Sequence, residues 1–369
     1  MRIWAVCKDP GGTAGMLPVV DELGRRGHSV ILIADNNSKA AEILAKKKRP
    51  FRYYYANDGI CGEGDPDVFI TSMCSRGGGI GRELVPVMKG KKIPTVVIQD
   101  FWGGGGNDGW QQSQSHPDYI TTNDEVGREV LTGAWPEFDP NRIIITGFPA
   151  FDKYAKMDFD AVRKQAQTKL GLNGNLPVIS FAGGGDLTDL VHRLLCGTLE
   201  RICWLDEGDY YFIPRPHPRT LSDFPAEAEL WQKTLAGLHR GPRVIYDFFG
   251  QCDMTEIVAA SDVVCSISST VLLDAAVMRR GAISIMPPAV KNRFRDQMGG
   301  VIDQYPLVPL GCCLEVSSVG DLGTTLAKFV KPKERVQNPL RQNQEKHVKT
   351  DGRNAARVAD LVESINRRV

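Results

Sequence analysis

The sequence lacks several features that would place it in a special class of protein. It has no apolar run of the roughly 18 residues that a membrane-spanning helix needs, and its first residues enter a strand pattern rather than a signal peptide. Its nine cysteines are scattered, without a Cys-x-x-Cys pair or the Cys/His spacing of zinc sites. We therefore expect a cytoplasmic protein with reduced, buried thiols and no bound metal.

An excess of charge of one sign is also missing, since 45 Lys and Arg residues oppose 44 Asp and Glu residues. This balance excludes a global field that would recruit an anionic partner, and a hydrophobic content of 42% excludes a disordered chain. Residues 331–369 differ, because they carry ten Lys or Arg and five Asp or Glu residues. They predict a basic, solvated helix, and contact with a polyanion is the alternative.

The 369 residues suggest two domains. An apolar run at 3–7, a helical spacing at 16–26 and a second apolar run at 28–34 form one βαβ pattern, and the alternation starts again at 178–182. We predict an α/β fold of two Rossmann-like, doubly wound domains that face a cleft. The acceptor-side domain is placed at 1–152, the nucleotide-sugar-binding domain at 153–349, and a basic helix that can pack back on the first domain at 350–369.

Two glycine-rich loops follow predicted strands. Ligands of parallel sheets bind at the carboxyl ends of the strands, where glycines let the backbone approach. The loop at 8–15 includes Gly12 and Thr13 and precedes a predicted helix near residue 16, so its amides suit a diphosphate. A simple tight turn is the alternative. Gly183 and Gly184 occupy the equivalent place in the second half.

A third loop is rich in hydroxyl groups. Ser268, Ser269 and Thr270 follow a predicted strand and lead into a helix, which is a suitable cradle for a phosphate. Asp274 lies one helical turn further, where a carboxylate can accept hydrogen bonds from ribose hydroxyls. The alternative is plain N-capping by Ser269 or Thr270, with Asp274 solvated.

A proline-rich segment at 214–219 displays two candidate phosphate ligands. Its three prolines hold Arg215 and His217 rigidly after a strand. The forked guanidinium of Arg215 suits a phosphate, and His217 can donate a hydrogen bond to it. We predict that both bind the donor, although an isolated histidine is more often structural.

Candidate acidic and aromatic residues lie in the first half. Asp100 follows the strand at 95–99 and Asp9 follows the first strand, so either is a candidate general base, with a cap as the alternative. Four consecutive glycines lie between Trp102 and Trp110, which predicts a mobile lid with aromatic platforms for an acceptor sugar or base.

These loops, in this order, resemble those of the GT-B glycosyltransferases and their relatives. Residues 11–30 look like the opening of the lipid-linked N-acetylglucosaminyltransferase of peptidoglycan synthesis, with Met16 in place of a histidine. Residues 145–152, 215–218 and 268–275 are similar to the non-hydrolysing UDP-N-acetylglucosamine 2-epimerases. His-Pro pairs also occur in glycerophosphate-polymer and sialic-acid transferases of this fold. The resemblance implies that the nucleotide and diphosphate contact Gly183, Arg215, His217, Ser268, Ser269 and Thr270, and that the ribose contacts Asp274.

The resemblance implies an inverting, metal-independent glycosyltransferase of the hexosyl or N-acetylhexosaminyl class. Its donor is a nucleoside-diphosphate sugar, foremost a UDP-sugar, and it needs no other cofactor. Asp100 or Asp9 would take the proton of an acceptor hydroxyl, on a glycan, a small molecule or a nucleic acid. The alternatives are a UDP-N-acetylglucosamine 2-epimerase, hydrolysing or not, a nucleic-acid-directed glycosyltransferase, and a binding module without catalysis. The segments at 97–103 and 273–274 depart from the epimerase pattern and count against that activity.

Overall fold

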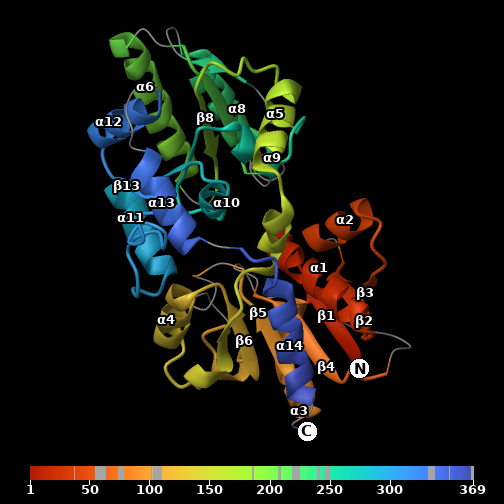
Figure 1. The fold of residues 1–369 in the computed structure, drawn as a ribbon. Coiled ribbons are helices and arrows are strands. Elements are labelled where there is room, and N and C mark those ends of the chain that lie inside the picture. The colour runs from red at the N-terminus through yellow and green to blue at the C-terminus, as the bar shows by residue number, and fades with distance from the viewer. Residues whose placement is uncertain are drawn as a thin grey trace. The chain divides into compact units, whose positions relative to one another are not determined.

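The computed structural model describes residues 1–36, 38–54, 64–73, 79–100, 102, 110–184, 187–206, 209–217, 225–238, 242–245, 250–330, 337–348 and 350–366. Its contacts divide the chain into two units, each with its own sheet (Figure 1). Unit 1 comprises Met1–Lys156, Arg295–Ile302 and Thr350–Val369, and unit 2 comprises Met157–Phe294 and Asp303–Lys349.

Unit 1 is built on a seven-stranded sheet in the order β3-β2-β1-β4-β5-β6-β7, in which every pairing is parallel. Its strands are β1 (Arg2–Cys7), β2 (Ser29–Asp35), β3 (Arg52–Tyr54), β4 (Val68–Ser72), β5 (Thr95–Ile98), β6 (Tyr119–Thr122) and β7 (Ile143–Ile145). Its helices include α1 (Pro10–Arg25), α2 (Lys39–Lys46), α3 (Ile80–Gly90), α4 (Glu125–Ala134) and α14 (Asn354–Asn366), with 3-10 segments at Ser113–Ser115, Pro140–Arg142 and Pro149–Lys156.

Unit 2 repeats this architecture with a six-stranded parallel sheet in the order β10-β9-β8-β11-β12-β13. Its strands are β8 (Val178–Ala182), β9 (Tyr211–Arg215), β10 (Arg243–Val244), β11 (Val263–Ser266), β12 (Gly281–Ile285) and β13 (Leu314–Val316). The helices of this part of the chain are α5 (Phe159–Lys169), α6 (Thr188–Asp206), α8 (Pro225–Ala236), α9 (Met254–Ala260), α10 (Val271–Val277), α11 (Pro288–Gln297), α12 (Val319–Val330) and α13 (Gln337–His347).

The sheets are covered on both faces, as continuous apolar strands require. Every residue of β4 and of β8 is buried, because helices flank parallel strands on either side. In each sheet the strand order reverses once, between β1 and β4 in unit 1 and between β8 and β11 in unit 2. Ligands of doubly wound folds bind at such switch points. The predicted class of two doubly wound α/β domains is confirmed, and the topology identifies where each domain would hold a ligand.

The C-terminal helix α14 belongs to unit 1, where its blue ribbon lies among red and orange elements (Figure 1). Val358 and Val362 are fully buried in the core that α1 also lines. On the polar side, Arg26 pairs with Glu363 at 3.0 Å, and the His28 ring lies 2.8 Å from the same carboxylate. Asp152 caps the helix by accepting hydrogen bonds from two of its first amides. Apolar burial and these polar contacts therefore fix the end of the chain to unit 1.

No helix in the described ranges is both long enough and apolar enough to cross a lipid bilayer.

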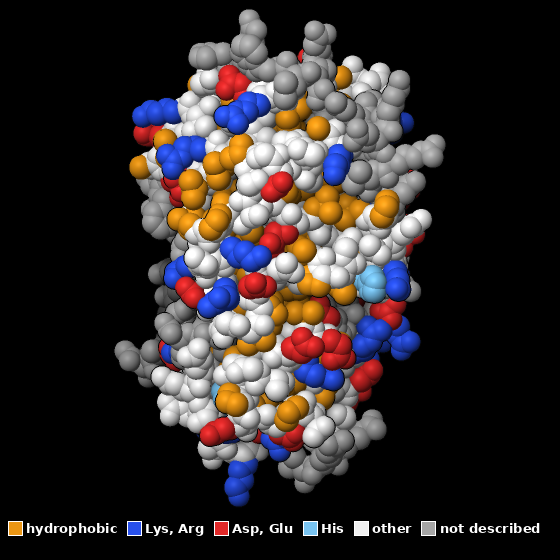
Figure 2. All heavy atoms as spheres, turned by 90° about the vertical axis from the view of Figure 1, so that its left-hand side faces the viewer, with side chains coloured by type: hydrophobic (Ala, Val, Ile, Leu, Met, Phe, Trp, Pro, Cys, Tyr) orange, Lys and Arg blue, Asp and Glu red, His pale blue; other side chains and the backbone are white. Residues whose placement is uncertain are grey.

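Charges of both signs are mixed on the surface. On the face in Figure 2, blue Lys and Arg side chains lie among red Asp and Glu side chains, and the described atoms of that face show no field of one sign. Part of the mixing comes from exposed ion pairs such as Arg193–Asp189 at 3.0 Å. This arrangement matches the near-zero net charge of the sequence.

Candidate functional site

The carboxyl ends of three strands meet at the switch point of unit 2. The Gly183 amide, just beyond β8, donates a 2.8 Å hydrogen bond to the carbonyl of Arg215 at the end of β9. The Ser266 hydroxyl, at the end of β11, donates a 2.7 Å bond to the carbonyl of Ala182 at the end of β8. These bonds hold three of the loops predicted from the sequence side by side.

The glycines after β8 allow a close approach of neighbouring side chains. A Cβ atom on Gly183 would lie 3.0 Å from both the Trp231 ring and the Thr188 methyl group. The Gly184 amide donates to the Thr188 hydroxyl at 3.1 Å, and a Cβ there would meet the His217 ring at 4.0 Å. The glycine loop and the proline-rich segment therefore lie next to each other, as a shared site requires.

Arg215 and His217 are both half-buried, which leaves part of each side chain accessible. The guanidinium of Arg215 lies near Gly250, where an added Cβ would be 3.5 Å from Nη2. Pro216 is buried between them and fixes the segment to the sheet. The last two residues of the proline-rich segment, Pro218 and Arg219, lie outside the described residues.

The hydroxyl-rich loop after β11 follows at the same edge of the sheet. Ser268, Ser269 and Thr270 are half-buried, and Asp274 is half-buried in the first turn of α10. The Ser269 hydroxyl accepts a 3.3 Å hydrogen bond from an amide of that turn, as the capping alternative predicts, whereas Thr270 makes no side-chain cap. The Tyr305 hydroxyl donates to the Ser269 carbonyl at 3.0 Å and anchors the loop.

The first loop of unit 1 differs from the prediction. Helix α1 begins at Pro10 and not near Met16, because Pro10 is pre-organised for a first helical position and Asp9 is its N-cap. The Gly12 amide donates to the Asp9 carboxylate at 2.7 Å, and the Thr13 amide donates to the Asp9 carbonyl at 3.0 Å. Gly12 and Thr13 thus do not present the bare amides that the predicted diphosphate cradle needs. This corrects their assignment as donor ligands.

The two candidate bases are near each other at the start of α1. A Cβ on Gly11 would lie 2.4 Å from the Asp100 carboxylate, so Asp100 rests on the first turn of the helix. Asp9 fits the capping alternative, since its side chain already serves Gly12. Asp100 lies just beyond β5, at the carboxyl edge of the sheet.

Trp102 and Trp110 are buried, with 0% and 1% of their surfaces exposed. The Trp102 ring nitrogen donates to both carboxylate oxygens of Asp124, at 2.8 and 3.0 Å. Burial raises the pKa of the Asp124 carboxyl, which also caps α4. Neither indole displays the face that the predicted acceptor platforms need, and this corrects that interpretation. The predicted lid at 103–109 lies outside the described residues.

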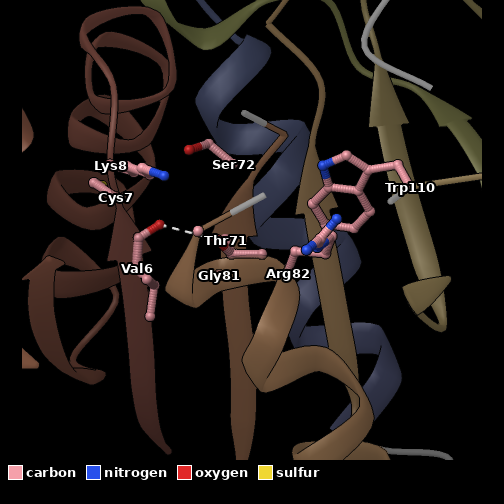
Figure 3. A pocket seen from close by; sticks show the side chains of 9 residues that line it. Val6, Cys7, Lys8, Thr71, Ser72, Gly81, Arg82 and Trp110 are labelled. Carbon is pink, nitrogen blue, oxygen red and sulfur yellow. Dashed lines mark hydrogen bonds between the residues drawn. The ribbon is translucent and has the colours of Figure 1, made fainter. Parts of the chain in front are cut away.

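A pocket that the sequence analysis did not predict opens at the switch point of unit 1 (Figure 3). Its cavity volume is about 10 Å³, about the space of one water molecule, and it opens to solvent. The ends of β1 and β4, the start of α3 and one indole form its lining: Val6, Cys7, Lys8, Thr71, Ser72, Gly79, Gly81, Arg82 and Trp110. The sequence did contain a signal for this pocket. A polar residue stands at the end of each of two apolar runs, Lys8 after β1 and Ser72 at the end of β4, and these two strands pair in the sheet.

Across the residues that the structure describes, no three His, Cys, Asp or Glu side chains are grouped closely enough to hold a metal ion. The side chains of six of the nine cysteines are described; all six are buried and none of them forms a disulfide. Burial raises the pKa of the Cys7 thiol to about 12, so this pocket-lining side chain is uncharged at neutral pH.

Comparison with known proteins identifies the family. The sequence model of the CDP-glycerol:poly(glycerophosphate) glycerophosphotransferases matches residues 102–364, which is more than half of the chain. The chain belongs to this family. A search of curated proteins found no match.

Solved structures show the same fold at low sequence identity. The UDP-GlcNAc 2-epimerase of Neisseria meningitidis has a TM-score of 0.67 at 12% identity, covering 99% of this chain and 100% of its own. MurG of Acinetobacter baumannii has a TM-score of 0.60 at 12% identity, with coverages of 98% and 99%. The wall teichoic acid polymerase TagF has a TM-score of 0.62 at 12% identity, with coverages of 100% and 89%. The predicted GT-B superfamily and its two-domain fold are confirmed.

Membership of the glycerophosphotransferase family makes the chain a GT-B transferase, in agreement with the predicted reaction class. The family match contains the whole switch point of unit 2, including Arg215, His217 and Asp274. Asp9 and Asp100 precede the matched residues, as does most of the pocket in unit 1. The family match therefore includes the residues predicted to bind the donor and does not include the two candidate bases.

One prediction tests the packing of α1 on β4. A Cβ on the buried Gly12 would lie 2.1 Å from the Ser72 hydroxyl oxygen, so Gly12→Ala should destabilise the protein by about 1–3 kcal/mol through overpacking. Urea unfolding measures this loss. Gly24→Ala in the same helix is the matched control, because nothing lies within 4 Å of its Cβ position. It should stabilise the protein by about 0.5–1 kcal/mol.

The cause of that destabilisation can be separated from backbone effects. Combining Gly12→Ala with Ser72→Gly removes the clashing side chain, so the double variant should regain most of the stability that Gly12→Ala loses. Additive losses in the two single variants would show that the close approach of Gly12 to Ser72 does not cause the effect.

Proposed function

We propose that this protein transfers glycerol phosphate from CDP-glycerol to a hydroxyl group of an acceptor. The observation that carries the proposal is the family match, which covers every described donor-side residue at the switch point of unit 2. It favours CDP-glycerol over the UDP-sugar expected from the sequence. The arrangement of charged and hydroxyl side chains at the ends of β8, β9 and β11 supports a nucleoside-diphosphate donor in either case.

The proposed reaction is a displacement at phosphorus. The acceptor oxygen forms a bond to the phosphorus atom that carries glycerol, and the bond from that atom to the bridging oxygen of the diphosphate breaks. CMP leaves with the electron pair of the broken bond, and the acceptor hydroxyl releases its proton. In-line attack opposite the leaving group inverts the configuration at phosphorus. A hexosyl or N-acetylhexosaminyl transfer would instead break a carbon–oxygen bond and release a nucleoside diphosphate.

We assign the donor's phosphates to Arg215 and His217. A guanidinium fork binds two phosphate oxygens, and the imidazole can donate a hydrogen bond to the oxygen that becomes negative as CMP leaves. The bonds that join the ends of β8, β9 and β11 hold the His217 ring beside Gly184, whose lack of a side chain leaves room for a ligand, while the Arg215 guanidinium lies near Gly250. Positive charge at this place takes the role that a metal ion has in other phosphoryl transferases, so we propose transfer without a metal.

The remaining roles follow from position. Asp274, in the first turn of α10, would accept hydrogen bonds from the ribose hydroxyls, with Ser268 and Thr270 beside it. In unit 1, Asp100 would accept the proton of the acceptor hydroxyl, since it lies at a strand end and Asp9 is engaged as a cap.

The first experiment identifies the donor by thermal shift with CDP, UDP, GDP, dTDP and ADP, each with and without magnesium. A ligand at about 100 times its dissociation constant stabilises the fold by about 2.7 kcal/mol. We expect CDP to give the largest shift, undiminished without magnesium, and Arg215→Ala and Asp274→Asn to abolish it. Arg341→Ala, which removes an exposed guanidinium from α13 in the same unit, is the matched control and should leave the shift intact.

Product analysis then decides the reaction. CDP-glycerol with a glycerol phosphate oligomer should release CMP, seen by ³¹P NMR. A UDP-specific shift together with turnover of UDP-N-acetylglucosamine in the absence of an acceptor would overturn the proposal in favour of the epimerase. The absence of a shift with any nucleotide would overturn the assigned donor site.

A further inference from the structure

We propose that the pocket at the switch point of unit 1 binds a phosphoryl group of the acceptor. This inference deepens the proposed function, because it names the chemical group by which unit 1 recognises its substrate. The pocket lies where β1 and β4 diverge, which is the place where doubly wound sheets bind ligands. Its residues belong to unit 1 alone, whereas the donor residues assigned above belong to unit 2.

Two cationic side chains line the pocket. Lys8 and Arg82 come from opposite sides, one after β1 and the other from the first turn of α3 (Figure 3). The Lys8 ammonium lies within 4 Å of no carboxylate among the described residues. The thiol of Cys7 is uncharged at neutral pH, so it contributes no negative charge to the lining. The described lining itself therefore contains two cationic groups and no carboxylate, and the acidic side chain beside Ser72, that of Asp9, is engaged as the cap of α1.

Helix α3 directs its N-terminus at the same space. It has 11 residues, and Gly79 at its N-cap provides no side-chain hydrogen bond for the first amides. The first turn comes close to the sheet because Gly81 has no side chain, since a Cβ there would lie 2.0 Å from the Thr71 hydroxyl. Lys8 runs alongside Gly79, where a Cβ would meet its Cδ at 2.4 Å and its Nζ at 3.2 Å. Amides at a helix N-terminus and a nearby ammonium are a suitable site for an anion.

A buried donor provides independent evidence of a ligand. The Trp110 side chain is 99% buried and lines the pocket, yet its ring N–H has no hydrogen-bond partner in the described structure. Figure 3 shows this nitrogen on the side of the indole that is turned towards Ser72. A buried N–H without an acceptor costs about 1–3 kcal/mol, and this one, unlike those of Trp4 and Trp231, lines the pocket, where an oxygen atom that enters could accept from it.

The size of the pocket and the kinds of donor present specify the group. The lining supplies an indole N–H, an ammonium, a guanidinium and the Ser72 hydroxyl, all of which can donate to the oxygens of a phosphoryl group. The Thr71 hydroxyl already donates to the Val6 carbonyl at 3.2 Å. The cavity measures about 10 Å³ and opens to solvent, so a phosphoryl group would place one oxygen atom in it, and a nucleoside with its sugar does not fit. In an enzyme that extends or modifies a phosphate-containing acceptor, this pocket would hold the acceptor's phosphate and so orient its hydroxyl.

The test observes Trp110 directly in the full-length protein. The protein has six tryptophans, so ¹⁵N-tryptophan labelling gives a small set of indole signals, and Trp110→Phe assigns the relevant one. Sodium phosphate is titrated at constant ionic strength, balanced with sodium chloride. We expect the Trp110 signal to move saturably as its N–H gains an acceptor, and Lys8→Gln to weaken the apparent affinity by about tenfold or more.

Two controls separate this site from others. Lys46→Gln removes an exposed ammonium from α2 and should leave the titration unchanged. Arg215→Ala removes the assigned phosphate ligand of unit 2 and should also leave it unchanged, which assigns the bound ion to unit 1. A Trp110 signal that does not move, or that moves equally in Lys8→Gln, would overturn the proposal. Because no donor is present, failure here is distinguishable from failure of the CDP-glycerol assay.

Discussion

We expect His217→Ala to lower the rate of glycerol phosphate transfer from CDP-glycerol by about 10²–10⁴-fold, the usual loss when a positioned proton donor is removed. The half-buried ring lies beside Gly184 and follows the buried Pro216, so its position is fixed before the donor binds. The loss should appear mainly in kcat, because a hydrogen bond to the departing CMP strengthens as negative charge develops. Initial rates of CMP release at saturating donor measure it.

A matched control uses His347, an exposed histidine among the described residues of unit 2. His347→Ala, at the end of α13, changes the same residue type on the surface and should leave kcat within about twofold of the parent value, as surface substitutions usually do. Thermal unfolding of both variants must be unchanged for the comparison to hold. If His217→Ala retains more than about a third of the parent kcat, His217 does not assist the departure of CMP.

The sequence was sufficient to predict most strands of both sheets, although not the edge strands β3 and β13, because the pattern of a buried parallel strand is local. Runs such as 68–72 and 178–182 are continuously apolar or small and end at polar or glycine residues, so the strands and the place of the loops follow directly. Strand order then brings Gly183, Arg215 and Ser266 together at one edge. For this reason the donor-side residues predicted from separate motifs are neighbours in the fold.

The acceptor side was harder to predict, because its properties depend on which groups are already engaged. A glycine-rich segment and a helical first turn look alike in sequence, and only the bond from the Gly12 amide to Asp9 decides between them. Tryptophans that flank glycines suggest an exposed platform, yet Trp102 is held inside by Asp124, 22 residues further along the chain. The unit 1 pocket joins Lys8 and Arg82 through the pairing of β1 with β4, which no local motif reveals.

We also expect the stability of unit 2 to fall by up to about 1.4 kcal/mol per pH unit as the pH drops below about 6.5, the ordinary pKa of histidine. The cause is His192 on α6, which is fully buried and lies parallel to Trp231 at 3.9 Å. Burial, with a smaller contribution from the charge of Arg193, lowers the pKa of His192 to about 3. Below pH 6.5 the unfolded chain therefore takes up a proton at this residue that the folded chain does not, and folding is penalised.

The variant His192→Phe should remove this acid sensitivity without a large loss of stability at pH 7. The Nδ1 atom of His192 has no hydrogen-bond partner among the described residues, and its Nε2 atom has only the Cys196 sulfur at 3.4 Å. An apolar ring therefore loses little and can stack on Trp231 in the same way.

Urea unfolding at pH 7, 6 and 5 measures how the free energy of unfolding changes with pH. This range lies above the titration of ion-paired carboxylates, such as Glu22, whose pKa the two neighbouring arginines lower to about 2. His347→Phe, on the exposed end of α13, should keep the parental slope. If the unfolding free energy changes equally with pH in His192→Phe and in the parent protein, the folded protein must protonate His192 as readily as the unfolded chain does. The ring would then have to become accessible to water without unfolding of the domain.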